Sequence, residues 1–215
     1  MRKILLFVWA CMGLVCLMSA CKTSVKSKEW KLVWVEDFDQ KNSFDESVWT
    51  KIPRGTSDWN NYMSYYDSCY AMQDGNLILR GIANHTQKND TAPYLTGGVY
   101  TKGKKLFTGG RVEVCARLQA AKGAWPAIWM LPEKAEWPKG GEIDIMERLN
   151  HDHIAYQTTH SYYTHILGIK DNPPHGGINK INPEEYNIYS VDIYPDSLVF
   201  AVNHRHTYTL SLIHI

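Results

Sequence analysis

Residues 141–147 read Gly-Glu-Ile-Asp-Ile-Met-Glu, three carboxylates set among residues that favour β-strands. Because alternate side chains of a strand share a face, Glu142 and Asp144 should point the same way and Glu147 the opposite way. One extra residue, a β-bulge at 145–146, would return Glu147 to the face of the other two acids. The stretch therefore predicts a bulged strand that presents three carboxylates on one surface.

The predicted spacing of Glu142 and Glu147 favours glycoside cleavage. At ~3.3 Å per residue, with one step lost to the bulge, their backbones would lie roughly 13 Å apart. Side chains that lean inward would bring the carboxyl groups towards the ~5 to 5.5 Å of retaining glycosidases rather than the ~6.5 to 9.5 Å of inverting ones. Three crowded carboxyl groups do not all ionise easily, so one should stay protonated as an acid. An edge strand with a solvated acidic face would show the same alternation, and the motif alone leaves that alternative open.

The flanking sequence favours the catalytic interpretation. Residues 141–147 resemble the ExDxxE signature of glycoside hydrolase family 16, the retaining endo-glycanases of laminarinase and lichenase type. Further motifs of that family follow one another in the family's order, namely VWVEDFD at 33–39, DGNLIL at 74–79, GGVYTK at 97–102, GRVEV at 110–114 and KGAWPAIWM at 122–130. The resemblance covers residues 30 to 209.

The resemblance implies an all-β fold, a β-jelly-roll sandwich with a concave substrate cleft, and a role for each matched residue. Glu142 matches the nucleophile, Glu147 matches the acid/base, and Asp144 matches the residue that holds and tunes the nucleophile. Aromatic platforms of the glycan-binding cleft are matched by Trp125, Trp129 and Trp137, and a cleft histidine is matched by His160. No cofactor is expected, and no metal site is indicated because the histidines lack the His-x-x-x-His spacing of a helical site.

One stretch departs from the family pattern and bears on the substrate. Residues 58–65 read Asp-Trp-Asn-Asn-Tyr-Met-Ser-Tyr, whereas laminarinase-type members usually carry Trp-Gly-Asn-Asn-Glu-Leu-Gln-Tyr. The Glu and Gln that would bind sugar hydroxyls are absent, which weakens the expectation of plain β-1,3-glucan. Trp59 and Asn61 remain candidate contacts, and so does Arg54, although Arg54 could equally belong to a polar surface loop.

Three functions stay open at this point. The first is a retaining endo-glycanase that acts on β-1,3- or mixed-linkage β-1,3/1,4-glucan. The second is an endo-β-galactanase or galactosidase of the same family that acts on agar-type polysaccharides or host O-glycans. The third is a non-catalytic carbohydrate-binding relative, although a pure binding protein has no need for Glu142, Asp144 and Glu147 together.

Composition indicates a single globular domain. A chain of 215 residues with a formal net charge of +1 suits one all-β sandwich. No basic stripe or phosphate-binding glycine loop points to nucleic acid, and a monomer is expected. Short alternating runs at 77–80, 110–118, 141–148 and 199–203, separated by Gly, Pro and Asn, predict the strands.

The N-terminus resembles that of an exported bacterial lipoprotein. Two basic residues precede an apolar run at 4–18 that is too short to span a membrane, and Met-Ser-Ala-Cys follows. Residues 1–20 are therefore expected to be a signal peptide, Cys21 to be acylated, and residues 21–29 to form a tether. The protein would then be membrane-anchored, at the periplasmic face or the cell surface; a general secretory signal is the alternative.

The C-terminal end carries a separate expectation. Residues 30–209 are expected to form an incomplete catalytic domain that lacks the closing strands of the sandwich. Residues 210–215, Leu-Ser-Leu-Ile-His-Ile, match the translation of a mosaic-end sequencing adapter, and a natural strand is the alternative. Cys69 and Cys115 could pair in an oxidising compartment, which the sequence does not decide.

Overall fold

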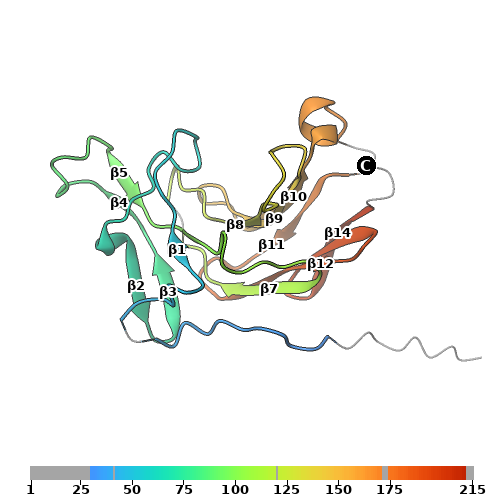
Figure 1. Ribbon diagram of the computed structural model, residues 1–215, viewed down its shortest axis with the longest axis horizontal. Helices are drawn as coiled ribbons and strands as arrows, with labels where there is room; N and C mark the ends of the chain where they lie inside the picture. The colour runs from blue at the N-terminus through green and yellow to red at the C-terminus, as the bar shows by residue number, and fades with distance from the viewer. Residues whose placement is uncertain (1–29, 41, 120, 171–173, 212–215) are drawn as a thin grey trace, which may run out of the picture. The chain divides into compact units, whose positions relative to one another are not determined.

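The structure is a computed structural model that describes residues 30–40, 42–119, 121–170 and 174–211 (Figure 1). All strands belong to the unit that begins at Leu32. The predicted signal peptide, the predicted lipidation site Cys21 and the predicted tether lie outside the described residues, and so do residues 212–215. Within the described part of the chain, no helix is long and apolar enough to cross a membrane.

Two antiparallel four-stranded sheets form a sandwich (Figure 1). The first has the order β11-β10-β9-β8 and contains β8 (Ala127–Met130), β9 (Glu142–Glu147), β10 (Ile154–His160) and β11 (Gly176–Lys180). The second has the order β14-β13-β12-β7 and contains β7 (Gly110–Ala116), β12 (Asn187–Ile193), β13 (Ser197–Val202) and β14 (Arg205–Ser211). The predicted all-β sandwich is confirmed.

The hydrophobic core lies between these sheets because each strand turns every second side chain inwards. β13 shows the pattern most clearly, since Leu198, Phe200 and Val202 are buried while the residues between them are half-buried. Phe200 stacks on Tyr208 of β14, with 4.5 Å between ring centroids and 8° between ring planes. Complete burial of an apolar side chain of this size contributes about 1.5–3 kcal/mol.

Three two-stranded sheets and two single helical turns complete the described structure. The pairs are β1 (Thr50–Lys51) with β6 (Val99–Tyr100), β2 (Tyr70–Gln73) with β3 (Asn76–Leu79), and β4 (Gly81–Ala83) with β5 (Tyr94–Thr96). The turns are a 3₁₀ turn, η1 (Asp67–Cys69), and a π-helical turn, η2 (Tyr162–Ile166). Asp74 and Gly75 have φ values of 52° and 70°, the left-handed conformation that a tight β2–β3 hairpin requires.

The sequence left two local questions open, and the structure bears on both. Cys69 is buried and Cys115 is exposed, and they do not form a disulfide. β14 continues to Ser211, with Leu210 buried opposite Leu198, so the first two residues of the suspected adapter stretch are paired strand residues. A Leu-Ser alternation fits a strand with one buried face whatever its origin. The adapter origin and the missing closing strands therefore stay predictions.

Candidate active site

β9 contains the predicted bulge. Asp144 lies opposite Thr158 of β10 and Glu147 lies opposite Tyr156, so two residues of β9 face the single residue Gln157. These two residues, 145 and 146, are both buried in the core. The extra residue shifts the alternation by one, which returns Glu147 to the face of the other acids.

Gln157 satisfies the backbone of the bulge from the neighbouring strand. Its side chain is completely buried, and its Nε2 donates to the Ile145 carbonyl at 2.8 Å. The same nitrogen lies 3.2 Å from the Ala201 carbonyl and 3.4 Å from the Ser190 carbonyl in the opposite sheet, while Thr207 Oγ1 donates to Oε1. A buried carbonyl without a donor would cost about 1–3 kcal/mol. Sequence reasoning missed Gln157, although a glutamine at a core-facing position of β10 was a usable signal.

Two tryptophans hold the two glutamates through their indole N–H groups. Trp125 Nε1 donates to Glu147 Oε1 at 2.7 Å, and Trp137 Nε1 donates to Glu142 Oε2 at 2.6 Å. Both tryptophans were expected to be sugar platforms, and with 51% and 47% of their surface exposed they keep area for a ligand. Trp125 lies before β8 rather than on it, whereas Trp129 belongs to β8.

Asp144 and His160 lie beside Glu142. Asp144 is 2% exposed, and His160 Nε2 lies 3.3 Å from its Oδ2, the distance of an ion pair when the imidazole is protonated. That oxygen has no aligned hydrogen-bond donor among the described residues. His160 is the cross-strand partner of Glu142, so the predicted cleft histidine contacts the acid group. Within the same part of the chain, these three residues are the one His/Cys/Asp/Glu group whose ligand atoms lie within 4.8 Å of one another.

Burial raises the pKa of all three acids. For Glu142, desolvation raises the pKa most and the neighbouring Asp144 adds to it, while His160 and the Trp137 indole oppose the rise. For Asp144, burial again raises the pKa most and His160 opposes it. Burial also raises the pKa of Glu147, against the Trp125 hydrogen bond.

His160 shows the opposite response to the same cluster. The Asp144 carboxylate raises the pKa of His160, while desolvation lowers it. A protonated imidazole therefore offsets part of the negative charge of the acids, and the remaining repulsion favours a proton on one of them. That division is what general acid catalysis beside an ionised nucleophile requires.

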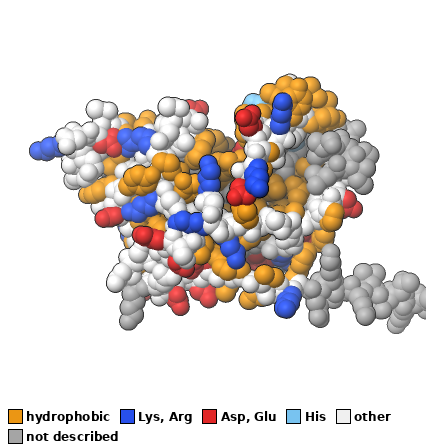
Figure 2. All heavy atoms as spheres, in the orientation of Figure 1, with side chains coloured by type: hydrophobic (Ala, Val, Ile, Leu, Met, Phe, Trp, Pro, Cys, Tyr) orange, Lys and Arg blue, Asp and Glu red, His pale blue; other side chains and the backbone are white. Residues whose placement is uncertain are grey.

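Aromatic side chains flank the acids on both sides of β9. On the β8 side, Trp129 lies opposite Asp144 in the ladder, and its ring meets the ring of Trp59 edge-on at 5.0 Å. On the other side, Trp137 meets His165 of η2 edge-on at 4.4 Å. Figure 2 shows hydrophobic side chains gathered over the η2 turn, where Tyr162, Ile166, Leu167 and Ile169 are exposed.

Two of the candidate sugar contacts differ in the partners that they have within the protein. Arg54 donates through Nη1 and Nη2 to the Asp90 carboxylate at 2.6 and 2.7 Å, and through Nε to the Met63 carbonyl at 2.9 Å. Its guanidinium is thus engaged within the protein, and a sugar contact by Arg54 stays a prediction. Asn61 is half-buried, and its Oδ1 has no partner among the described residues.

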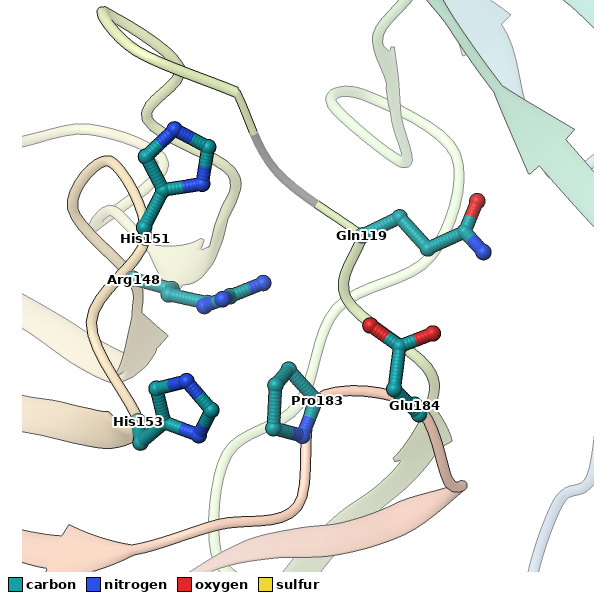
Figure 3. Close-up of a pocket in the computed structure, with 6 residues that line it drawn as sticks. All are labelled: Gln119, Arg148, His151, His153, Pro183 and Glu184. Carbon is teal, nitrogen blue, oxygen red and sulfur yellow. The ribbon is translucent and has the colours of Figure 1, made fainter.

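A cavity of about 370 Å³ follows the end of β9 and is separate from the acid group (Figure 3). Its lining comprises Gln119, Arg148, His151, His153, Pro183 and Glu184. Arg148 donates to the carbonyls of Asp152 and Leu118, so much of its hydrogen-bonding capacity serves the chain itself. None of the residues predicted from the sequence to bind sugar lines this cavity.

The chain is similar to proteins of known activity. Residues 84–177 match the model of the XgeA-like catalytic GH16 domain. The chain is 36% identical to a keratan-sulfate endo-1,4-beta-galactosidase of Sphingobacterium multivorum over 87% of its own length, and spans 44% of that relative. It is 30% identical to a beta-glucanase of Rhodothermus marinus over 87% of its own length, and spans 68% of that relative.

A solved structure agrees with these relatives. The laminarinase catalytic domain of Thermotoga maritima superposes with a TM-score of 0.74 at 27% identity, over 87% of this chain and 79% of that domain. Fold, motif order and bulged acidic strand therefore agree with the similarity in sequence. The chain belongs to glycoside hydrolase family 16.

Proposed function

We propose that the protein is a retaining endo-β-glycanase that cleaves β-1,3- or mixed-linkage β-1,3/1,4-glucan. The observation that carries the proposal is the bulge in β9, which gathers Glu142, Asp144 and Glu147 on one face. The similarity to a beta-glucanase and to a laminarinase domain supports the choice of glucan.

The arrangement supports a double displacement. The Glu142 carboxylate attacks the anomeric carbon while the bond from that carbon to the leaving oxygen breaks and Glu147 gives that oxygen its proton. In the second step Glu147 takes a proton from water, the water oxygen bonds to the anomeric carbon, and Glu142 leaves as a carboxylate. The sugar thus keeps its β configuration.

The neighbours of the two glutamates suit these roles. Burial and Asp144 raise the pKa of Glu142, while His160 and the Trp137 hydrogen bond oppose the rise and so favour the ionised form that a nucleophile needs. Glu147 has a raised pKa through burial, which favours the protonated form that an acid needs. Trp59 and Trp129 offer aromatic surface on which the apolar faces of sugar rings can stack.

A second candidate is an endo-β-galactosidase that acts on galactose-containing glycans such as keratan-type chains, host O-glycans or agar-type polysaccharides. The 36% identity to a keratan-sulfate endo-1,4-beta-galactosidase favours it. The departure of residues 58–65 from the laminarinase pattern points in the same direction, because the Glu and Gln that would bind glucan hydroxyls are absent.

A digestion panel tests the proposal and separates the two candidates. The full chain is incubated with laminarin, mixed-linkage glucan, agarose and keratan sulfate, with Glu142→Gln as the matched control. If the wild type, but not Glu142→Gln, releases oligosaccharides from the two glucans and from no other polymer, the first candidate is supported. Release from the galactose-containing polymers alone supports the second, and no release from any polymer contradicts both.

We also propose that the protein is a monomer anchored to a membrane through an acylated Cys21, at the periplasmic face or the cell surface. The motif Met-Ser-Ala-Cys after a short apolar run supports the anchor. Labelled palmitate should enter the wild-type protein in a bacterial host, and Cys21→Ala should abolish both the label and the membrane association. A soluble protein with unmodified Cys21 would contradict the anchor.

A further inference from the structure

Arg54 ties together three segments that are distant in the sequence. Its two terminal nitrogens bind both carboxylate oxygens of Asp90, and its Nε binds the Met63 carbonyl. A bidentate pair between a guanidinium and a carboxylate fixes orientation as well as distance, because two parallel hydrogen bonds define a plane. Arg54 therefore fastens both ends of the segment 55–62 to the loop that carries Asp90.

The loop that carries Asp90 has hydrogen bonds of its own that do not involve Arg54. Asn84 Nδ2 donates to the carbonyls of Asp90 at 2.8 Å and Ala92 at 3.0 Å, and lies 3.4 Å from that of Gln87. The Ala92 N–H donates to Asp90 Oδ1 at 3.0 Å, and the Gln87 N–H donates to Asn84 Oδ1. The Asp90 carboxylate is thus held in place by its own loop and serves as an anchor.

The fastened segment presents Trp59 to the active site. Within it, the Asn60 carbonyl accepts from the N–H groups of Gly55 and Met63, which closes the loop at its base. Trp59, next to Asn60, is 41% exposed, and its ring meets Trp129, the residue opposite Asp144. A continuous series of contacts therefore runs from the Arg54–Asp90 pair through Trp59 to the strand that carries the acids.

We propose that Arg54 and Asp90 form a positioning pair that sets Trp59 against Trp129, and thereby builds the aromatic wall that binds the glycan on the β8 side of the cleaved bond. The proposal rests on the proposed glycanase function. The side chains of Arg54 and Asp90 hydrogen-bond to each other, to the Met63 carbonyl and to the Ala92 N–H, and among the described residues none of these bonds goes to the acids. Loss of the pair should therefore weaken the binding of long oligosaccharides and leave the chemical step intact.

Kinetics on oligosaccharides of increasing length test the positioning role. Arg54→Ala and Asp90→Ala should each raise KM about 3- to 10-fold for substrates long enough to reach Trp59, with kcat within about twofold of wild type. The effects of the two substitutions on KM should be less than additive in the double variant, because both single variants remove the shared Arg54–Asp90 pair. Lys51→Ala, which breaks the partly exposed Lys51–Asp67 pair, is the matched control and should leave KM unchanged.

Hydrogen exchange supplies a readout that does not depend on turnover. The backbone amides of residues 55–63 should exchange faster in Arg54→Ala and Asp90→Ala than in wild type and in Lys51→Ala, while those of β9 should be unaffected. If the wild type cleaves no glycan, the proposed function fails, and exchange in 55–63 still tests the pair. Unchanged exchange, additive effects in the double variant, or a fall in kcat with faster exchange in β9 would each overturn the positioning role.

Discussion

The indole N–H of Trp137 donates a 2.6 Å hydrogen bond to Oε2 of Glu142. A hydrogen bond to the ionised form of a carboxyl group lowers its pKa, and here it opposes the larger effect of burial. Trp137→Phe replaces the indole with a smaller aromatic ring that has no N–H donor, so the pKa of Glu142 should rise. Because the nucleophile must be ionised, the acidic limb of the profile of kcat/KM against pH should move to higher pH.

Trp125→Phe should move the alkaline limb of the profile of kcat/KM against pH. Trp125 donates to Glu147, and its loss should raise the pKa of the group that must be protonated to act as the acid. The alkaline limb should therefore move to higher pH while the acidic limb stays in place. The measurement is the same profile recorded for both phenylalanine variants. Movement of the same limb in both variants would contradict the assignment of the two glutamates to different roles.

Glu147→Gln should lower turnover by at least ~10²-fold and yet raise the melting temperature at pH 7. Burial raises the pKa of Glu147 in the folded protein, so the folded state binds the proton more tightly than the unfolded chain does. Ionisation of Glu147 thus destabilises the fold progressively as pH rises from the unfolded pKa through the raised folded pKa.

Calorimetry of wild type and Glu147→Gln over a range of pH tests whether ionisation of Glu147 destabilises the fold. The variant's advantage in melting temperature should be largest at neutral pH and should shrink towards acidic pH, where the wild-type carboxyl group is also neutral. Glu113→Gln, on the exposed face of β7, is the control and should change the melting temperature little. A variant that melts below wild type at pH 7 would argue against burial as the dominant influence on Glu147.

Gln157→Leu should lower both kcat and stability, because it leaves the Ile145 carbonyl of the bulge without its donor. The bulge aims Glu147, so a change in its backbone alters the distance between the acid and the nucleophile. Thr207→Val removes the hydrogen bond to the far side of the same amide, and with it the bond that Thr207 Oγ1 accepts from Asn179, and should have a smaller effect on kcat. Measuring kcat and melting temperature for both variants separates the position of Glu147 from overall stability. If Gln157→Leu and Thr207→Val lose the same kcat while their melting temperatures differ, Gln157 has no role in positioning Glu147.

The acidic strand was predictable because its determinants are local. Side chains of a strand alternate with a period of two, and the apolar pair Ile145 and Met146 separates Glu147 from the other two acids. All three acids can then share one face only if the strand has a bulge at Ile145 and Met146. The alternating runs predicted β3, β7, β9 and β13 for the same reason. The strands that can be predicted from the sequence are therefore those in which buried and exposed side chains alternate.

Contacts across long sequence separations were not predictable. Arg54 and Asp90 are 36 residues apart in the sequence, and the residues around neither of them indicate that the two side chains form a pair. Gln157 could be matched to the bulge only once the register of β10 against β9 was known. For Trp125 and Trp137, the residue type indicates a cleft aromatic, but the direction of the indole N–H depends on loops that no periodicity describes.

The stereochemistry of the first product tests the central claim most directly. Proton NMR of the newly released reducing end, recorded within the first turnovers on whichever polymer of the panel is cleaved, distinguishes the two anomers before they equilibrate. If Glu142 and Glu147 act as nucleophile and acid/base on one face of β9, the β anomer appears first and the α anomer grows in later by mutarotation. An α anomer that appears first would show inversion and would contradict the double displacement.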